Sequence, residues 1–194
     1  MNHTIVFATN NKHKIEEVQL LLGDRFNLIS LSSLGHMEDI PENQTTLEGN
    51  ALEKARFISH AYKVECFADD TGLEIDALHG EPGVYSARYA GPDKDSMANM
   101  RKVLEKLKGV RNRKARFRTV IALVWKGSEY LFEGTVEGSL IESPRGTMGF
   151  GYDPIFIPDG CQETFAEMKL SDKNLISHRA RATQKLVAFL LSTR

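Results

Sequence analysis

The sequence predicts an α/β protein with a mixed central sheet, flanking helices and two lobes. In the first half of the chain, short apolar runs alternate with amphipathic segments of helical spacing, which is typical of βαβ units. Two longer strand-like segments follow around Gly127 and indicate an antiparallel pair. No repeat, low-complexity tract or linker interrupts the 194 residues, so we expect residues 1–194 to form one domain with two lobes.

The first half of the chain is expected to hold three strands and two helices. In order, these are a strand at 5–8, a helix over KHKIEEVQLLLG, a strand at 28–31, a helix at 45–62 and a strand at 66–68. Gly23 is the expected stop of the first helix. The third strand is expected to end at Asp69 and Asp70, where Gly72 permits a turn.

The second half is expected to begin with a loop rich in Gly, Pro and Tyr. The expected elements are this loop at 80–91, a helix at 96–107, strands at 116–125 and 129–142, a Gly-containing loop before IFIP, and a closing helix at 175–191. The apolar face of the closing helix includes Leu186, Phe189 and Leu190.

Composition narrows the class of protein. The 25 basic and 26 acidic residues give a net charge of −1, which argues against a nucleic-acid polymer as partner but permits a small basic pocket. Cys66 and Cys161 have no metal-ligand spacing and are expected to be reduced structural thiols. The sequence offers neither a signal peptide nor a run of about twenty apolar residues, so we expect no membrane partner and a cytoplasmic location.

The segment FATNNKHKIEE is the first candidate for ligand binding. A strand followed by a helix N-terminus presents unpaired N–H groups and partial positive charge, which favour anions. Thr9 and Asn11 can donate hydrogen bonds, and Lys14 in the first turn can reach a phosphate. The alternative is that Asn11 only caps the helix and Lys14 is a surface residue.

Two adjacent acids at the end of an apolar strand are the second candidate. Asp69 and Asp70 repel each other unless a cation or proton intervenes, and Mg²⁺ prefers oxygen ligands shared with substrate phosphates. Glu42, in a polar loop, is a plausible third carboxylate. The alternative is that Asp69 to Gly72 form a turn with solvated acids.

The third candidate is a late cluster of aromatic and cationic residues. The ring of Phe150 can stack on a base, and His178 and Arg179 offer donors to carbonyl oxygens and ring nitrogens. Each has an ordinary alternative, with Phe150 in a core and the other two on a helix surface.

Five segments together resemble the inosine triphosphate pyrophosphatase family. They are ATNNKHKIEE, IPE followed by TTLEGNALEKAR, FADDTGLEIDALHGEPGVYSARYAG, GFGYDPIF and KNLISHRARA. They occur in the order of the family and extend from about Thr9 to Arg181. The resemblance implies a homodimer of a two-lobed α/β fold around a central cleft. It also implies hydrolysis of ITP, dITP and XTP between the α and β phosphates, which cleanses the nucleotide pool.

The same resemblance implies roles for individual residues. Substrate binding falls to Thr9, Asn10, Asn11, Lys12, His13, Lys14, Thr71, Phe150, Gly151, Tyr152, Asp153, Lys173, His178 and Arg179. Glu17 supports the phosphate site, Glu42 and Asp70 bind Mg²⁺, and Asp70 is the proton acceptor. The division of labour between Asp69 and Asp70 stays open, with Asp69 as a further candidate metal ligand.

Two other functions remain as alternatives. Septum-formation-inhibitor-like nucleotide pyrophosphatases have a different base preference, but they usually have Ser-Pro-Arg-Arg after the first strand, where this chain has Asn-Asn-Lys-His-Lys. A non-catalytic nucleotide-binding module is the second alternative, and the acids Glu42, Asp69 and Asp70 argue against it.

Overall fold

The central element of the protein is a six-stranded mixed sheet. The computed structural model describes residues 3–38 and 40–193. The strands are β1 (His3–Phe7), β2 (Phe26–Ser30), β3 (Cys66–Ile75), β4 (Lys114–Trp125), β5 (Ser128–Leu140) and β6 (Phe156–Pro158). Their order across the sheet is β2-β1-β3-β4-β5-β6. β1 pairs in parallel with β2 and β3, whereas β5 and β6 are antiparallel, so the predicted mixed sheet is confirmed.

The helices are placed between and after the strands, as the alternation of the sequence predicts. They are α1 (Lys12–Leu22), α2 (Leu47–Tyr62), α3 (Ser96–Lys106), α4 (Leu170–Ile176) and α5 (His178–Ser192). Short 3₁₀ turns occupy residues 23–25, 32–34, 76–78, 83–88 and 153–155. The chain divides into two compact units. The first comprises residues 1–70, 119–134 and 179–194, and the second comprises residues 71–118 and 135–178.

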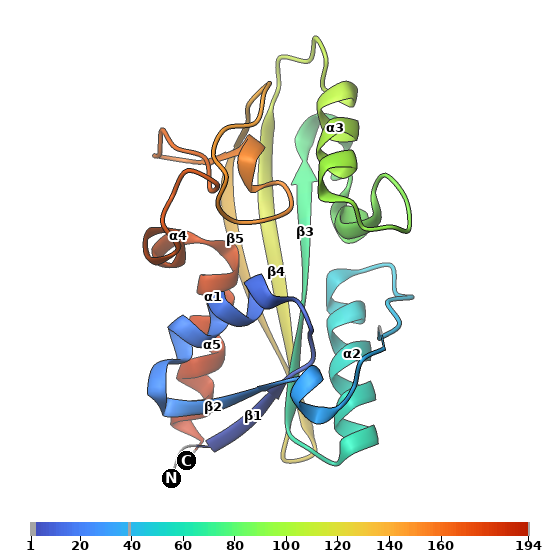
Figure 1. Ribbon diagram of the computed structural model, residues 1–194, viewed down its shortest axis with the longest axis vertical. Helices are drawn as coiled ribbons and strands as arrows, with labels where there is room; N and C mark the ends of the chain where they lie inside the picture. The colour runs from blue at the N-terminus through green and yellow to red at the C-terminus, as the bar shows by residue number, and fades with distance from the viewer. Residues whose placement is uncertain (1–2, 39, 194) are drawn as a thin grey trace. The chain divides into compact units, whose positions relative to one another are not determined.

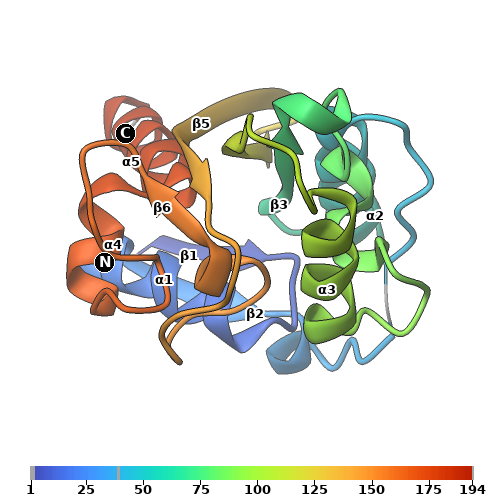
Figure 2. The same cartoon turned by 90° about the horizontal axis from the view of Figure 1, so that it is seen from above.

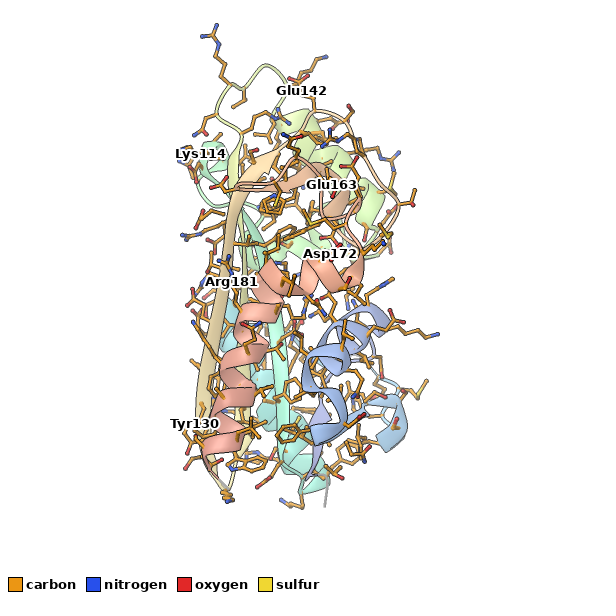
Figure 3. All side chains as sticks on the ribbon, turned by 90° about the vertical axis from the view of Figure 1, so that its left-hand side faces the viewer. Lys114, Tyr130, Glu142, Glu163, Asp172 and Arg181 are labelled. Atoms are coloured by element: carbon orange, nitrogen blue, oxygen red, sulfur yellow. The ribbon has the colours of Figure 1, made fainter. Side chains whose placement is uncertain are left out.

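The first unit is organised around α1, α5 and the strands that they cover. Val18 and Leu22 of α1 share a core cluster with Leu186 and Leu190 of α5, and the two helices run side by side (Figure 1). Near the start of β5, Tyr130 (labelled in Figure 3) packs on Phe189, with ring centroids 4.3 Å apart. Burial of these apolar faces stabilises the unit, because each fully buried large side chain contributes roughly 1.5–3 kcal/mol.

The second unit has its own core, to which α3 contributes Met100 and Val103. Figure 2 shows α3 on one side of this unit and β6, with the loop leading into it, on the other. Phe117 of β4, Phe156 of β6 and Phe165 lie in the same core, with ring centroids of Phe117 and Phe156 4.7 Å apart. The loop that leads into β6 is therefore attached to a tightly packed core.

The predicted turn after Ala68 is wrong. β3 continues through Asp69 and Asp70 to Ile75, so the two acids lie on opposite faces of one strand, because successive side chains alternate. Gly72 is needed for close packing instead: a Cβ atom there would lie 2.7 Å from the carbonyl oxygen of Gly83. The alternation of Asp69 and Asp70 decides the geometry of the site described below.

The single closing helix predicted at 175–191 is also wrong. Ser177 has an extended backbone conformation (φ −67°, ψ 154°) and separates α4 from α5. The hairpin around Gly127 is confirmed as a two-residue loop, in which Lys126 and Gly127 have φ of 49° and 76°. In the described part of the chain, no helix has the length and apolar character needed to cross a membrane.

Candidate functional site

The loop between β1 and α1 has both features that the sequence suggested, a helix cap at Asn11 and polar side chains at a helix N-terminus. Asn11 caps α1, since its side chain accepts a hydrogen bond from the backbone N–H of Lys14 at 3.3 Å. Thr9 Oγ1 accepts from the backbone N–H of Asn11 at 3.2 Å, which fixes the turn. Lys12 and His13 are exposed on the first turn. The first turn of α1 thus carries two lysines, Lys12 and Lys14, at a helix N-terminus, an arrangement that favours an anion.

Lys14 is tied to the first of the two acids. Its Nζ donates to Asp69 Oδ1 at 2.7 Å, and the other oxygen of Asp69 accepts from Arg179 Nε at 3.1 Å. Arg179 also donates to Glu17, which projects from α1. Arg179 and Glu17 are 1% and 3% exposed, so this charged group is an integral part of the first unit.

Asp70, on the other face of β3, belongs to a second group of polar side chains. Asn50 Nδ2 donates to Asp70 Oδ2 at 3.0 Å, and Lys54 Nζ lies 3.8 Å from Asp70 Oδ1. Lys54 also donates to Glu42 Oε1 at 2.5 Å. The ammonium of Lys54 therefore stands between the carboxylates of Glu42 and Asp70.

The two acids have opposite electrostatic environments. Burial by itself would raise the pKa of Asp69, but Lys14 and Arg179 lower it below its usual value. Burial raises the pKa of Asp70, with Glu42 adding to the effect, and Lys54 only partly opposes it. Asp69 is thus a stable anion that holds two cations, whereas the ionised form of Asp70 is destabilised and gains from an additional cation.

Sequence reasoning missed Asn50 and Lys54, although α2 contained a signal for both. They are 0% and 7% exposed and lie four residues apart within the stripe formed by Ala51, Ala55 and Ile58. A polar pair in a buried helical stripe is unusual, because buried polar groups require partners. Asn50 Oδ1 also accepts from the backbone N–H of Gln44 at 2.9 Å, which anchors the loop that carries Glu42.

A second cluster, in the second unit, is organised by Asp153. Its Oδ2 accepts from the backbone N–H of Phe150 at 2.9 Å and from Lys173 Nζ at 2.8 Å. Lys173 Nζ also lies 5.2 Å from the ring centroid of Phe150. Tyr152 donates its hydroxyl to the carbonyl of Ser86 at 2.8 Å. Asp153 therefore fixes the loop and the nearby ammonium together.

His178 lies in the same unit among aromatic rings. It is 3% exposed and stacks on Phe117, with centroids 4.7 Å apart and an angle of 18° between the ring planes. Phe150 is partly exposed, so its ring retains accessible surface. Rings and donors of this kind suit a planar heterocycle.

Gly149 offers a test of the role of Asp153. A Cβ atom at Gly149 would lie 2.2 Å from Asp153 Oδ2, whereas a Cβ atom at Gly151 meets nothing within 4 Å. Both glycines have positive φ, 75° and 64°, so alanine brings similar backbone strain at each. We expect Gly149→Ala to lower the free energy of unfolding by about 1–3 kcal/mol more than Gly151→Ala, because of overpacking. Urea denaturation measures this difference, and equal losses would contradict the role of Asp153.

The predicted site residues fall into the two units. Residues 9–14, Glu42, Asp69, Asp70 and Arg179 belong to the first, and Thr71, residues 150–153, Lys173 and His178 belong to the second. Their individual roles stay predictions. Arg179 in particular is buried against Asp69 and Glu17. Arg179→Ala is therefore expected to lower the stability of the fold, whatever the role of Arg179 in recognition of a base.

The fold and these clusters define an α/β protein that holds ion-paired, largely buried side chains in each of its two units. Residues 5–189 match the sequence model of the Ham1 family. The chain therefore belongs to the Ham1 family, and the family resemblance noted from its motifs is confirmed.

Individual relatives are similar in sequence to this chain over nearly its whole length. A dITP/XTP pyrophosphatase from Flavobacterium johnsoniae is 50% identical over 190 residues, covering 98% of this chain and 99% of that protein. A dITP/XTP pyrophosphatase from Porphyromonas gingivalis is 52% identical over 188 residues, covering 96% and 97%. Among solved structures, the Ham1 protein of Staphylococcus aureus matches with a TM-score of 0.88 and 40% identity, covering 98% of this chain and 100% of that one.

Proposed function

We propose that this protein hydrolyses dITP, XTP and ITP to the nucleoside monophosphate and pyrophosphate. The observation that carries the proposal is the pair of acids on β3, which hold different cations on the two faces of the strand. Relatives about 50% identical over nearly the full chain are named dITP/XTP pyrophosphatases, which supports the same substrates here. The protein would remove deaminated purine nucleotides from the nucleotide pool.

The carboxylates of Glu42 and Asp70 fit a hard divalent cation such as Mg²⁺. Both already face one cationic centre, Lys54 Nζ, at 2.5 and 3.8 Å. Within residues 3–38 and 40–193, no three His, Cys, Asp or Glu side chains are grouped to hold a metal ion by themselves. Two carboxylates are nevertheless sufficient for Mg²⁺, since it usually keeps several waters and shares substrate phosphates.

The residues of the first unit would perform the chemical step. Glu42 and Asp70 would hold Mg²⁺, which would supply charge neutralisation and lower the pKa of the attacking water. Asp70 accepts the proton of the attacking water as its oxygen bonds to the α phosphorus. The bond between that phosphorus and the bridging oxygen breaks, and pyrophosphate leaves with the electron pair. Lys14, held by Asp69, compensates the phosphate charge.

The residues of the second unit would select the base. His178 would provide a donor for the six-position carbonyl, and the partly exposed ring of Phe150 would provide a stacking surface. Adenine presents a donor at this position, so a buried donor of the protein would be left unpaired. We therefore expect discrimination against ATP of at least about 100-fold in kcat/KM.

A pyrophosphate-release assay tests this function. It compares ITP, dITP and XTP with the common purine and pyrimidine triphosphates, with Mg²⁺ and with EDTA. We expect pyrophosphate from the deaminated purines and loss of turnover in EDTA. Orthophosphate as the product would show that another phosphoanhydride is cleaved. A preference for pyrimidines would favour the septum-formation-inhibitor-like alternative, and binding without turnover would favour a nucleotide-binding module.

We also propose a homodimer and a cytoplasmic location. Both follow from the family resemblance and from the proposed substrates, which are free nucleotides. Sedimentation equilibrium tests the assembly: we expect twice the mass of the 194-residue chain at micromolar concentration. A species of single-chain mass across that range would contradict the dimer.

A further inference from the structure

We propose that Phe117 is a positioning residue for base recognition, whose ring holds the imidazole of His178 in one orientation. The proposal rests on the proposed function, because it takes His178 as a donor to the base. Neither the motifs of the chain nor the candidate site residues include Phe117.

The geometry around His178 carries this inference. The ring of Phe117 is stacked on the imidazole, at 4.7 Å between centroids and 18° between planes. Phe165 approaches the same imidazole at 6.2 Å and 45°. Phe117 is 5% exposed and belongs to the core of the second unit, so its own position is fixed by packing.

Stacking matters here because the second side-chain torsion of histidine has a broad energy profile. A flat ring against one face of the imidazole disfavours tilting of the imidazole, and this keeps its ring nitrogens in one plane. An aromatic pair contributes an interaction equivalent to roughly a 2- to 12-fold change in an equilibrium constant. Loss of the stack should therefore weaken the discrimination between a carbonyl and an amino group by a similar factor.

Phe156 provides a matched control in the same core. It is 0% exposed, and its ring lies 4.7 Å from that of Phe117 and 5.4 Å from that of Phe165. Phe156→Leu removes a similar aromatic volume from the same cluster without removing the stack on His178. Phe117→Leu and Phe156→Leu should therefore lower Tm by similar amounts. Only Phe117→Leu removes the ring that stacks on the imidazole of His178.

The experiment measures kcat/KM for ITP and for ATP in both variants. We expect Phe117→Leu to lower the ITP-to-ATP ratio about fivefold, within the range set by an aromatic pair. We expect Phe156→Leu to keep the wild-type ratio. On a His178→Gln background, Phe117→Leu should change the ratio no further, since its effect acts through the imidazole. An unchanged ratio in Phe117→Leu, or equal changes in both variants, would overturn the proposal.

A second measurement separates this proposal from the proposed function. The ring current of Phe117 should shift the ring protons of His178 upfield in the NMR spectrum of the ligand-free protein. These resonances should move downfield in Phe117→Leu and stay in place in Phe156→Leu. Unchanged resonances in Phe117→Leu would refute the positioning role, whether or not ITP is hydrolysed. Absence of ITP hydrolysis by the wild type would instead refute the proposed function. Phe117→Met replaces Phe117→Leu if the latter fails to fold.

Discussion

Asp70→Asn is expected to lower kcat for dITP by at least about 10³-fold, because it removes the proton acceptor and one carboxylate of the proposed metal site. The folded structure should persist. Burial raises the pKa of Asp70 above that of the unfolded chain, so the ionised carboxylate destabilises the folded protein at neutral pH. A neutral side chain of equal size keeps an acceptor for Asn50, and the free energy of unfolding should change by no more than about 1 kcal/mol.

Asp159→Asn is the control for this variant. Asp159 is exposed, and its substitution should leave turnover and stability at wild-type values. Steady-state pyrophosphate release and urea denaturation measure the two properties. Turnover of Asp70→Asn close to that of Asp159→Asn would remove Asp70 from the mechanism.

Asp69→Asn, unlike Asp70→Asn, is expected to lower the free energy of unfolding. Asp69 is an anion held by Lys14 and Arg179, and its replacement removes the carboxylate paired with Lys14 and one of the two paired with Arg179, which keeps Glu17. Breaking a buried ion pair in this way costs about 3–5 kcal/mol. For a chain of this length, the expected decrease in Tm is roughly 6–20 °C. Turnover should fall as well, since Lys14 loses its anchor.

The difference in the free energy of unfolding between wild type and Asp69→Asn is expected to depend on pH. Although burial opposes them, Lys14 and Arg179 lower the pKa of Asp69 below its unfolded value of about 3.9. The stabilisation by Asp69 is therefore fully present above about pH 4 and is lost as the pH falls below that value. Denaturation of wild type and Asp69→Asn at several pH values should show the gap closing in acid.

Asp70→Asn serves as the matched comparison for Asp69→Asn. The two substitutions are chemically identical and affect neighbouring residues of β3. We expect one to lose activity with stability retained and the other to lose stability. Equal unfolding midpoints for the two variants would contradict the separate environments assigned to Asp69 and Asp70.

The alternation of apolar runs and helical segments was sufficient to predict the fold class. It also placed α1, its stop at Gly23 and the hairpin at Gly127, because these elements depend on local residue preferences. Local preferences failed at Asp69-Asp70-Thr71-Gly72. Turn-forming residues continue there as a strand, because pairing within the sheet and contacts across it outweigh the turn preference.

In the candidate site, too, the sequence predicted some features and the tertiary structure decided others. The sequence identified Glu42, Asp69, Asp70 and Lys14 as candidates but missed Lys54, and its motifs identified the family. It could not assign Lys14 and Arg179 to Asp69, or Lys54 and Asn50 to Asp70, since these partners are separated by 16 to 110 residues.

The sequence by itself therefore determined the fold class, the positions of α1 and of the hairpin at Gly127, the family and several charged candidates for the site. Only the tertiary structure decided which charges meet. The physical reason is that one extended strand directs neighbouring side chains to opposite faces, where Asp69 meets residues of α1 and α5 and Asp70 meets residues of α2. The electrostatic contrast between Asp69 and Asp70 arises from that packing, because a pKa depends on burial and on nearby charges in space.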